Sequence, residues 1–141
     1  MNSKVVIIGA GIAGLCISYY LSRKNVPHII IERGEIANTW INERWNNFHL
    51  VNPNWAIKIP EFGFGTRYFP SKNAHGFLNK IQTIEYIKSF ASYVGSKIYI
   101  NENVDSIVKE KDIYKIVTST RTIVTDTVIV ASGAFGESYI P

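Results

Sequence analysis

Along the N-terminal part of the chain, two unbroken apolar runs flank a stretch with a helical apolar period. Val5–Ile8 is rich in β-branched residues and ends in glycine, which is typical of a strand buried on both faces. From Ile12 to about Lys24 the apolar positions follow the period of an amphipathic helix. His28–Ile31 is a second apolar strand, and it ends at Glu32. The pattern therefore predicts a βαβ unit with a right-handed crossover.

The segment from Asn38 to about Phe77 keeps neither a helical nor a strand period, and Pro53, Pro60 and Pro70 interrupt it. A compact domain rarely contains so long an irregular segment unless the segment builds a binding site. The aromatic content favours a second interpretation equally, in which these side chains fill a small core. The aromatic residues are Trp40, Trp45, Phe48, Trp55, Phe62, Phe64, Tyr68 and Phe69.

The second half of the chain predicts one helix followed by short strands. Thr83 can cap a helix that runs to about Val94, and Gly95 can close it. Two-residue turns separate three of the strands, which is the signature of an antiparallel meander. The expected fold class is therefore α/β, a Rossmann-like domain with a parallel sheet and a three-stranded antiparallel meander. The predicted strands are Lys97–Ile100, the meander strands Val104–Glu110, Ile113–Thr118 and Arg121–Thr125, and a final buried strand, Thr127–Ala131.

Composition fits one globular domain over residues 1–141, with 46% hydrophobic and 13% aromatic residues. The 15 basic and 11 acidic residues are interleaved, so we expect no nucleic-acid partner. Because Cys16 is the only cysteine, the chain can form no internal disulfide, redox cysteine pair or cysteine-rich zinc site. His28, His49 and His75 lack a ligand cluster at metal spacing, so we expect structural or exposed roles and no metal site.

The apolar stretch from Val5 to Leu21 resembles a signal peptide in hydrophobicity. Three glycines interrupt it, however, and no small-residue cleavage site follows. The stretch is also too short and too broken to cross a bilayer. We therefore expect a cytoplasmic protein without a membrane span.

A G-x-G-x-x-G motif, Gly9–Ala10–Gly11–Ile12–Ala13–Gly14, lies between the first predicted strand and the first predicted helix. Gly9 permits the tight turn, Gly11 lets a pyrophosphate approach the backbone, and Gly14 lets the helix lie close to the strand. The helix start presents free N–H groups and partial positive charge to phosphates. Glu32 ends the second strand, where a carboxylate can accept hydrogen bonds from ribose hydroxyls. The sequence thus predicts a dinucleotide site.

The motif alone does not separate NAD from FAD. Glu32 argues against a 2′-phosphate at this site, because a 2′-phosphate would need Arg or Lys. A simple NAD domain would continue with alternating helices and strands, whereas this chain continues with a meander that leads to Ala131–Ser132–Gly133. That combination resembles the flavoproteins with two dinucleotide-binding domains, in which the FAD unit is N-terminal and an "A-T-G" turn follows the meander. Ser132 replaces the threonine of that turn.

Within that superfamily, the chain most resembles the flavin-containing monooxygenases and their bacterial relatives. The family-specific residues are Asn38–Thr39–Trp40, Arg44–Trp45 and the stretch Phe48–Pro53, which are similar to a "TW…RW…L.L..P" pattern. The C-terminal Gly136–Pro141 is similar to the "G…P.IP" segment of the same proteins.

The resemblance implies FAD as the cofactor and assigns no catalytic residue. It places Gly9, Gly11 and Gly14, with the helix start Ile12–Ala13, at the pyrophosphate, and Glu32 and Arg33 at the adenosine. It places Trp40 and Arg44 on the flavin side and the backbone of Val104 at the adenine. Ala131, Ser132 and Gly133 correspond to the "A-T-G" turn. In such enzymes NADPH reduces FAD, and a flavin C4a-hydroperoxide then oxygenates a small hydrophobic or nucleophilic substrate.

The sequence also departs from this family. Residues 1–141 contain no second glycine motif for NADPH and no F-x-G-x-x-x-H stretch, so the chain resembles the first part of an enzyme, a fragment or a truncated product. The disulfide reductases of the superfamily are disfavoured, because they need a redox cysteine pair. Three interpretations stay open: the FAD-binding portion of an NADPH-dependent oxidoreductase, a non-catalytic FAD- or NAD-binding module, and a small protein that binds NAD directly.

Overall fold

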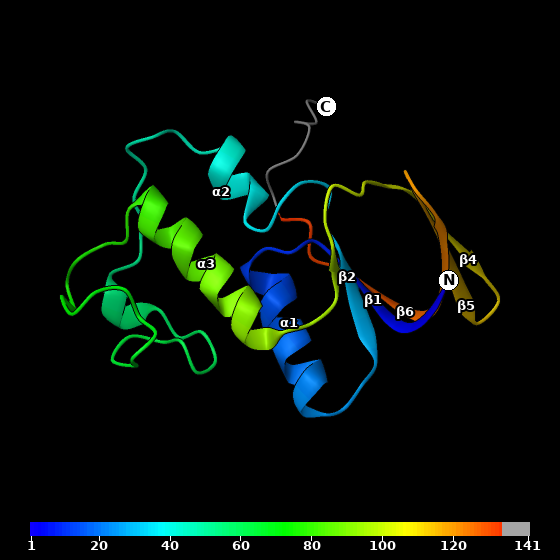
Figure 1. The fold of residues 1–141 in the computed structure, drawn as a ribbon, viewed down its shortest axis with the longest axis horizontal. Coiled ribbons are helices and arrows are strands. Elements are labelled where there is room, and N and C mark those ends of the chain that lie inside the picture. The colour runs from blue at the N-terminus through cyan, green and yellow to red at the C-terminus, as the bar shows by residue number, and fades with distance from the viewer. Residues whose placement is uncertain (134–141) are drawn as a thin grey trace.

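The computed structural model describes residues 1–133, which form three layers (Figure 1). Helices α1 (Ile12–Arg23) and α3 (Lys80–Val94) cover one face of the strands β1, β2 and β6, and the strands β4 and β5 lie on the opposite side. Within this part of the chain, no helix has the length and apolar content that a membrane crossing requires. The resemblance of Gly136–Pro141 to the monooxygenases lies outside the described residues.

The sheet has six strands in the order β3-β2-β1-β6-β5-β4. Strand β1 pairs in parallel with β2 and with β6, and β2 pairs in parallel with β3, whereas β6–β5 and β5–β4 are antiparallel. The predicted α/β class, with a parallel sheet and a meander, is confirmed. The strands are β1 (Asn2–Ile8), β2 (His28–Ile31), β3 (Ile98–Tyr99), β4 (Val104–Glu110), β5 (Ile113–Thr118) and β6 (Thr122–Val130).

Strand β6 joins two strands that the sequence predicts as separate, Arg121–Thr125 and Thr127–Ala131. Residues 122–125 pair with β5 as the third meander strand, and the strand from Val124 to Val130 pairs with β1, so Val124 and Thr125 pair on both sides. The polar residues in the middle do not interrupt it, because the buried Thr125 hydroxyl lies 3.1 Å from the Lys4 carbonyl oxygen and 3.0 Å from that of Thr127. One strand therefore connects the meander to the parallel sheet, and Val130 at its end is 65% exposed rather than buried.

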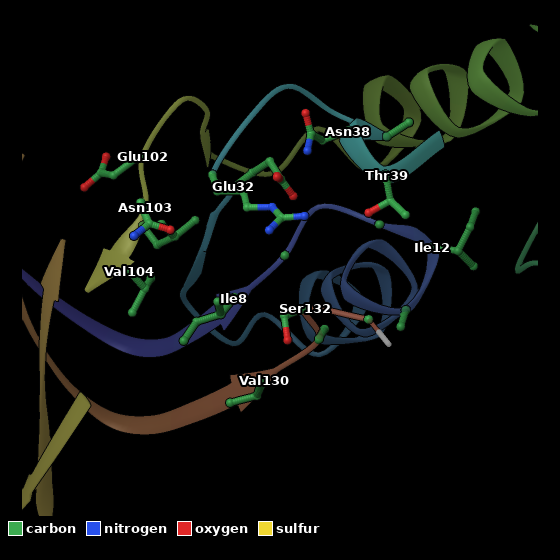
Figure 2. Close-up of a pocket in the computed structure, with 18 of the residues that line it drawn as sticks. Ile8, Ile12, Glu32, Asn38, Thr39, Glu102, Asn103, Val104, Val130 and Ser132 are labelled. Atoms are coloured by element: carbon green, nitrogen blue, oxygen red, sulfur yellow. The ribbon is translucent and has the colours of Figure 1, made fainter. Parts of the chain in front are cut away.

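The two-residue alternation of β1 and β2 divides the core into two parts. Val5, Ile7 and Ile30 face the helices, whereas Val6 and Ile31 face the meander. Both parts are needed because strands with apolar side chains on both faces must be covered on both. Figure 2 shows Ile8 and Val130 side by side, at the ends of the neighbouring strands β1 and β6.

Helix α3 begins three residues before Thr83, the cap that the sequence predicts. Asn79 is the true N-cap: its side chain accepts a hydrogen bond from the Gln82 backbone, and the Gln82 side chain accepts one from the Asn79 backbone. This reciprocal pair satisfies two backbone donors that a helix start leaves free. Thr83 is instead buried in the first turn, with its hydroxyl donating to the Asn79 carbonyl. The predicted closure at Gly95 is confirmed by its left-handed φ of 67°.

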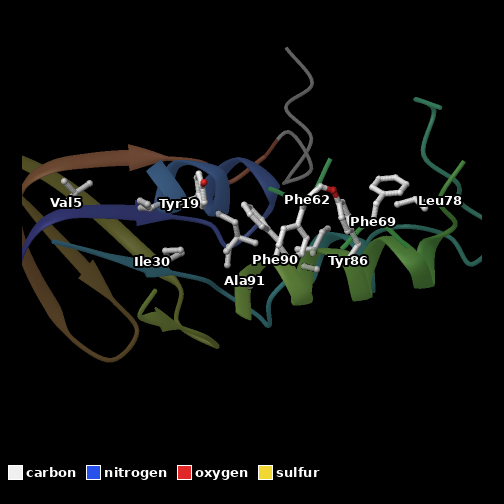
Figure 3. Close-up of a cluster of buried hydrophobic side chains, with 14 residues drawn as sticks. Val5, Tyr19, Ile30, Phe62, Phe69, Leu78, Tyr86, Phe90 and Ala91 are labelled. Atoms are coloured by element: carbon white, nitrogen blue, oxygen red, sulfur yellow. The ribbon is translucent and has the colours of Figure 1, made fainter. Parts of the chain in front are cut away.

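The irregular segment combines the two interpretations that its aromatic content allows. It contains only the short helix α2 (Asn38–Asn42) and the 3₁₀ turn η1 (Asn54–Ala56), joined by turns. Phe62 and Phe69 are buried against Tyr86 and Phe90 of α3, and Figure 3 shows this cluster continuing toward Val5 and Ile30 of the sheet. The segment fills part of the core, and its N-terminal end reaches the pocket that is described next.

Candidate functional site

A pocket of about 570 Å³ opens at the carboxyl ends of β1, β2 and β6. This volume lies within the range of about 300–1,000 Å³ that is usual for small-molecule sites. Open parallel sheets bind their ligands at this edge, because the loops that follow the strands converge there. Figure 2 shows Ile12 and Thr39 toward one end of the pocket and Glu102, Asn103 and Val104 at the other.

The three glycines of the motif have different surroundings. Gly9 has a φ of 108°, and a methyl group there would lie 2.4 Å from the Ala131 carbonyl oxygen. At Gly14 a methyl group would lie 2.0 Å from the Gly9 carbonyl oxygen, so this residue permits the contact between α1 and the loop. At Gly11 a methyl group would meet nothing within 4 Å, and Gly11 lines the pocket. Gly14 does not line the pocket, so its part is packing.

The N-terminus of α1 forms one wall of the pocket. Gly11 is its N-cap, no side chain caps the helix, and its first turn contains no acidic residue. The first N–H groups of a helix have no partner within the helix, and the helix dipole adds partial positive charge there. Ile12 and Ala13 bring this end of the helix to the pocket. The wall is therefore suited to an anionic ligand.

Glu32 directly follows β2 and is 7% exposed. Its Oε2 accepts a hydrogen bond from the Ala10 backbone N–H at 2.8 Å, and its Oε1 accepts one from the Gly34 N–H at 3.0 Å. The carboxylate thus fixes the glycine loop relative to the β2 end while it lines the pocket. Each carboxylate oxygen can accept more than one hydrogen bond, so both retain capacity toward a ligand.

Arg33, Trp40 and Arg44 lie on the side of the pocket formed by α2. The Arg33 guanidinium forms an ion pair with Glu43, the C-cap residue of α2. The Arg44 guanidinium lies 5.3 Å from the Trp40 ring centroid and 4.9 Å from that of Phe48. The aromatic stretch predicted from the sequence therefore supplies a stacked cation and indole to this wall.

The opposite end of the pocket is formed where β3 leads into β4. The Glu102 backbone N–H donates to the Glu32 carbonyl at 2.9 Å, and the Glu32 N–H donates to the Tyr99 carbonyl at 2.8 Å. Val104 and Ile107 of β4 line this end together with Val130 of β6. The result is an apolar end beside a ladder of backbone hydrogen bonds.

All of the predicted cofactor-contacting residues except Gly14 line this one pocket, and Ala131, Ser132 and Gly133 close it beside the glycine loop. Sequence reasoning missed several other lining residues. Ile8, Ile31 and Val130 could have been found, because residues at the ends of parallel strands share one edge of the sheet. Asn38 and Thr39 belong to the stretch that resembles the monooxygenases, but the resemblance places only Trp40 and Arg44 of that stretch at the cofactor. Glu102, Asn103 and Ile107 had no local signal.

The histidines lie in other surroundings. His28 Nδ1 donates to the Val26 carbonyl at 2.8 Å, and its Nε2 lies 2.7 Å from the Ser18 hydroxyl and 3.1 Å from that of Ser96. This network joins α1, β2 and the turn after α3. His49 and His75 are exposed, and none of the three lines the pocket.

An open parallel sheet, a glycine loop that leads into a helix and an acid at the end of the second strand define a Rossmann-like dinucleotide-binding domain. The chain belongs to the pyridine nucleotide-disulphide oxidoreductase family, whose profile matches residues 6–141. An uncharacterized CzcO-like oxidoreductase of Geobacillus kaustophilus is 32% identical over 97% of this chain. A probable indole-3-pyruvate monooxygenase of Arabidopsis thaliana, YUCCA1, is 30% identical over 96% of it. The chain spans 38% and 32% of the lengths of these two relatives.

Solved structures share the fold at lower identity. A flavin-containing monooxygenase from Stenotrophomonas maltophilia matches 99% of this chain with a TM-score of 0.84 and 22% identity, and the match covers 41% of that protein. The bacillithiol disulfide reductase of Staphylococcus aureus matches 94% of this chain with a TM-score of 0.82 and 18% identity, over 39% of its own chain. The predicted Rossmann-like fold is thus shared with both kinds of enzyme.

Proposed function

We propose that the pocket holds the ADP half of FAD and that residues 1–141 are the FAD-binding portion of an NADPH-dependent, monooxygenase-like oxidoreductase. The observation that carries this proposal is the joining, in one pocket, of the uncapped α1 N-terminus and the Glu32 carboxylate. An anion-binding wall next to a hydrogen-bond acceptor matches a pyrophosphate next to a ribose.

Each part of the ligand has a matching part of the pocket. Gly11 leaves open space where the phosphates would approach the backbone N–H groups of Ile12 and Ala13. Glu32 would accept hydrogen bonds from the ribose hydroxyls. Adenine would lie between the apolar side chains at the β4 end, with the Val104 backbone at its edge. The charge of Glu32 disfavours a 2′-phosphate here, which supports FAD over NADP at this site.

The flavin side would lie toward Trp40 and Arg44. When bound and reduced by NADPH, FAD would supply the electrons for activating oxygen toward a small hydrophobic or nucleophilic substrate. The residues of this chain would bind the cofactor, orient it and exclude water from one side. The monooxygenase activity is supported by the YUCCA1 relative and by the absence of a second cysteine for disulfide chemistry within residues 1–141.

We further propose that residues 1–141 form a single, incomplete FAD-binding domain. Turnover would require, in addition, a domain that binds NADPH. The matched region covers 38% of the length of the CzcO-like relative and 32% of that of the YUCCA1 relative. The lone cysteine in residues 1–141 supports a reducing, cytoplasmic setting.

The test is to purify the chain, record its visible spectrum and identify the nucleotide released on denaturation. A yellow protein that releases FAD, or a colourless one that becomes yellow on incubation with FAD, supports the proposal. A colourless protein that binds NADH and not FAD contradicts it.

A second measurement separates cofactor binding from turnover. We expect no sustained NADPH oxidation by the FAD-loaded chain under air, because residues 1–141 carry no second dinucleotide motif. Sustained, FAD-dependent NADPH oxidation would contradict the proposed incompleteness of the domain.

A further inference from the structure

Glu102 is a buried carboxylate whose position the proposed FAD contacts do not explain. The residue is 2% exposed and lies at the β4 end of the pocket. Figure 2 shows its side chain directed away from Ile8 and Val130, so the carboxylate faces the protein rather than the pocket. A buried carboxylate is costly unless it is paired and hydrogen-bonded, so its partners indicate what it stabilises.

Two side chains bind this carboxylate, one from the last residue of β5 and one from the β5–β6 turn. The Thr118 hydroxyl lies 2.5 Å from Glu102 Oε1, and Arg121 Nε lies 2.9 Å from the same oxygen. The Arg121 guanidinium also lies 4.2 Å from the ring centroid of Tyr99, the last residue of β3. Glu102 is therefore the point at which the β5–β6 turn is attached to the β3–β4 connection.

The backbone on either side of Glu102 is held at the same time. The Glu102 N–H donates to the Glu32 carbonyl at 2.9 Å, and the Asn103 carbonyl accepts from the Ser119 N–H at 3.0 Å. The pairing of β4 with β5 shifts register between Val104 and Ser106. Because this irregularity interrupts the regular strand pairing next to Asn103, the position of the Asn103–Val104 backbone depends on the contacts made by Glu102 and its neighbours.

We propose that Glu102 is a positioning residue that fixes the Asn103–Val104 backbone as the edge of the pocket that recognises adenine. The inference rests on the proposed FAD site and adds to it a determinant of base selectivity. Glu102 does not itself contact the base. It acts by holding the backbone donor and acceptor groups that do, through the β5–β6 turn on one side and Glu32 on the other.

Base selectivity distinguishes positioning from general stability. Adenine presents an amino donor and a ring-nitrogen acceptor, whereas hypoxanthine presents a carbonyl acceptor and an N–H donor at the same two places. A fixed backbone edge that pairs with adenine leaves its groups unpaired against hypoxanthine. A loosened edge binds both bases similarly, while the phosphate wall at α1 is unaffected.

The experiment measures dissociation constants of ADP, IDP and AMP for the full chain by calorimetric titration. Wild type is compared with Glu102→Ala, Glu102→Gln and the control Glu110→Ala, which removes an exposed glutamate at the end of β4. We expect Glu102→Ala to lower the preference for ADP over IDP by about fivefold or more, which is the effect expected from the loss of one hydrogen bond to the base. The preference for ADP over AMP should change by less than about twofold, because the phosphate contacts at α1 are separate.

Glu102→Gln should lose less selectivity than Glu102→Ala, because its amide oxygen can still accept from Thr118 and Arg121, and Glu110→Ala should match wild type. If Glu102→Ala does not fold, Thr118→Val carries the same expectation, since it removes only the hydroxyl at 2.5 Å. The role of Glu102 would be overturned if Glu102→Ala left the preference for ADP over IDP unchanged, or lowered it as much as the preference for ADP over AMP. Equal binding of ADP and IDP by wild type would also overturn it. A wild-type chain that binds neither ADP nor FAD would instead overturn the proposed function.

Discussion

At the residue scale, the motif Gly9–Gly14 shows which parts of a site are visible in a sequence. Each glycine could be assigned from its place between a strand and a helix, and Glu32 from its place at the next strand end. The sequence could not show that both oxygens of Glu32 also hold backbone N–H groups. It gave no sign of Glu102 either, because the partners of that carboxylate lie on a turn that only folding brings close.

Gly11→Ala should mainly weaken FAD binding, whereas Gly14→Ala should mainly lower stability. A methyl group at Gly11 points into open space at the pocket, so we expect weaker FAD binding and a stability loss below about 1 kcal/mol from the poorer N-cap. A methyl group at Gly14 would lie 2.0 Å from the Gly9 carbonyl oxygen. Overpacking of this kind costs about 1–3 kcal/mol or more. Urea unfolding and FAD titration of both variants measure the contrast, and equal effects on stability would contradict it.

Glu32→Ala should weaken FAD and ADP binding. A hydrogen bond to a charged group contributes about 1.5–3 kcal/mol, so we expect an affinity loss of roughly ten- to hundredfold. Glu35→Ala is the matched control, because Glu35 is exposed and pairs with Lys88 outside the pocket. Fluorescence titration with FAD measures both variants. Unchanged affinity in Glu32→Ala would remove this residue from the site.

At the scale of elements, the sequence predicts helices α1 and α3 and most strands, but it does not predict α2, and several boundaries differ. Strand β1, for example, begins at Asn2 rather than at Val5. The apolar period beside Thr83 predicts a helix start there, whereas the reciprocal hydrogen bonds between Asn79 and Gln82 start the helix earlier. The sequence predicts two strands, Arg121–Thr125 and Thr127–Ala131, where the structure has the single strand β6. Strand pairing on both sides, which no local pattern contains, keeps it continuous.

Asn79→Ala tests the observed start of α3. Removing an N-cap asparagine typically costs about 0.5–2 kcal/mol, so the free energy of unfolding should fall by about 1 kcal/mol. Asn46→Ala, at an exposed turn position, should leave it unchanged. Urea denaturation followed by circular dichroism measures both. A start at Thr83 would instead leave Asn79→Ala as stable as the control.

Tyr86 connects α3 to the irregular segment and makes stability sensitive to alkaline pH. Its buried hydroxyl donates to the Phe62 carbonyl, and burial, with a smaller effect of Cys16, raises the pKa of Tyr86 far above its usual value. Unfolded tyrosine ionises near pH 10. Because the folded state holds the proton more tightly, the stabilisation is complete below about pH 10 and is lost as the pH rises further.

Tyr86→Phe should therefore lose about 0.5–1.5 kcal/mol of stability at pH 7, from the missing hydrogen bond. Its stability should also fall less steeply than that of wild type above pH 10. Burial raises the pKa of Cys16 as well, but that contribution is present in both proteins and cancels in the comparison. Urea unfolding at pH 7 to 11 measures the difference, and parallel curves for the two proteins would contradict it.

At the scale of the whole molecule, the layers follow from strands that are apolar on both faces, and this much could be predicted. Their arrangement could not: β3 and β4 are consecutive in the chain but lie at opposite edges of the sheet. The connection between them passes Glu32 and brings Asn103 and Val104 to the pocket. The adenine end of the proposed site is thus a property of the topology rather than of any local motif.

Competition for FAD tests the central claim most directly. The nucleotide-free chain is titrated with FAD by flavin fluorescence anisotropy and then challenged with ADP and, separately, with FMN. If the pocket holds the ADP half of FAD, ADP displaces FAD completely and FMN displaces none of it at the same concentration. Displacement by FMN and not by ADP, or no binding of FAD at all, would contradict the assignment of this pocket.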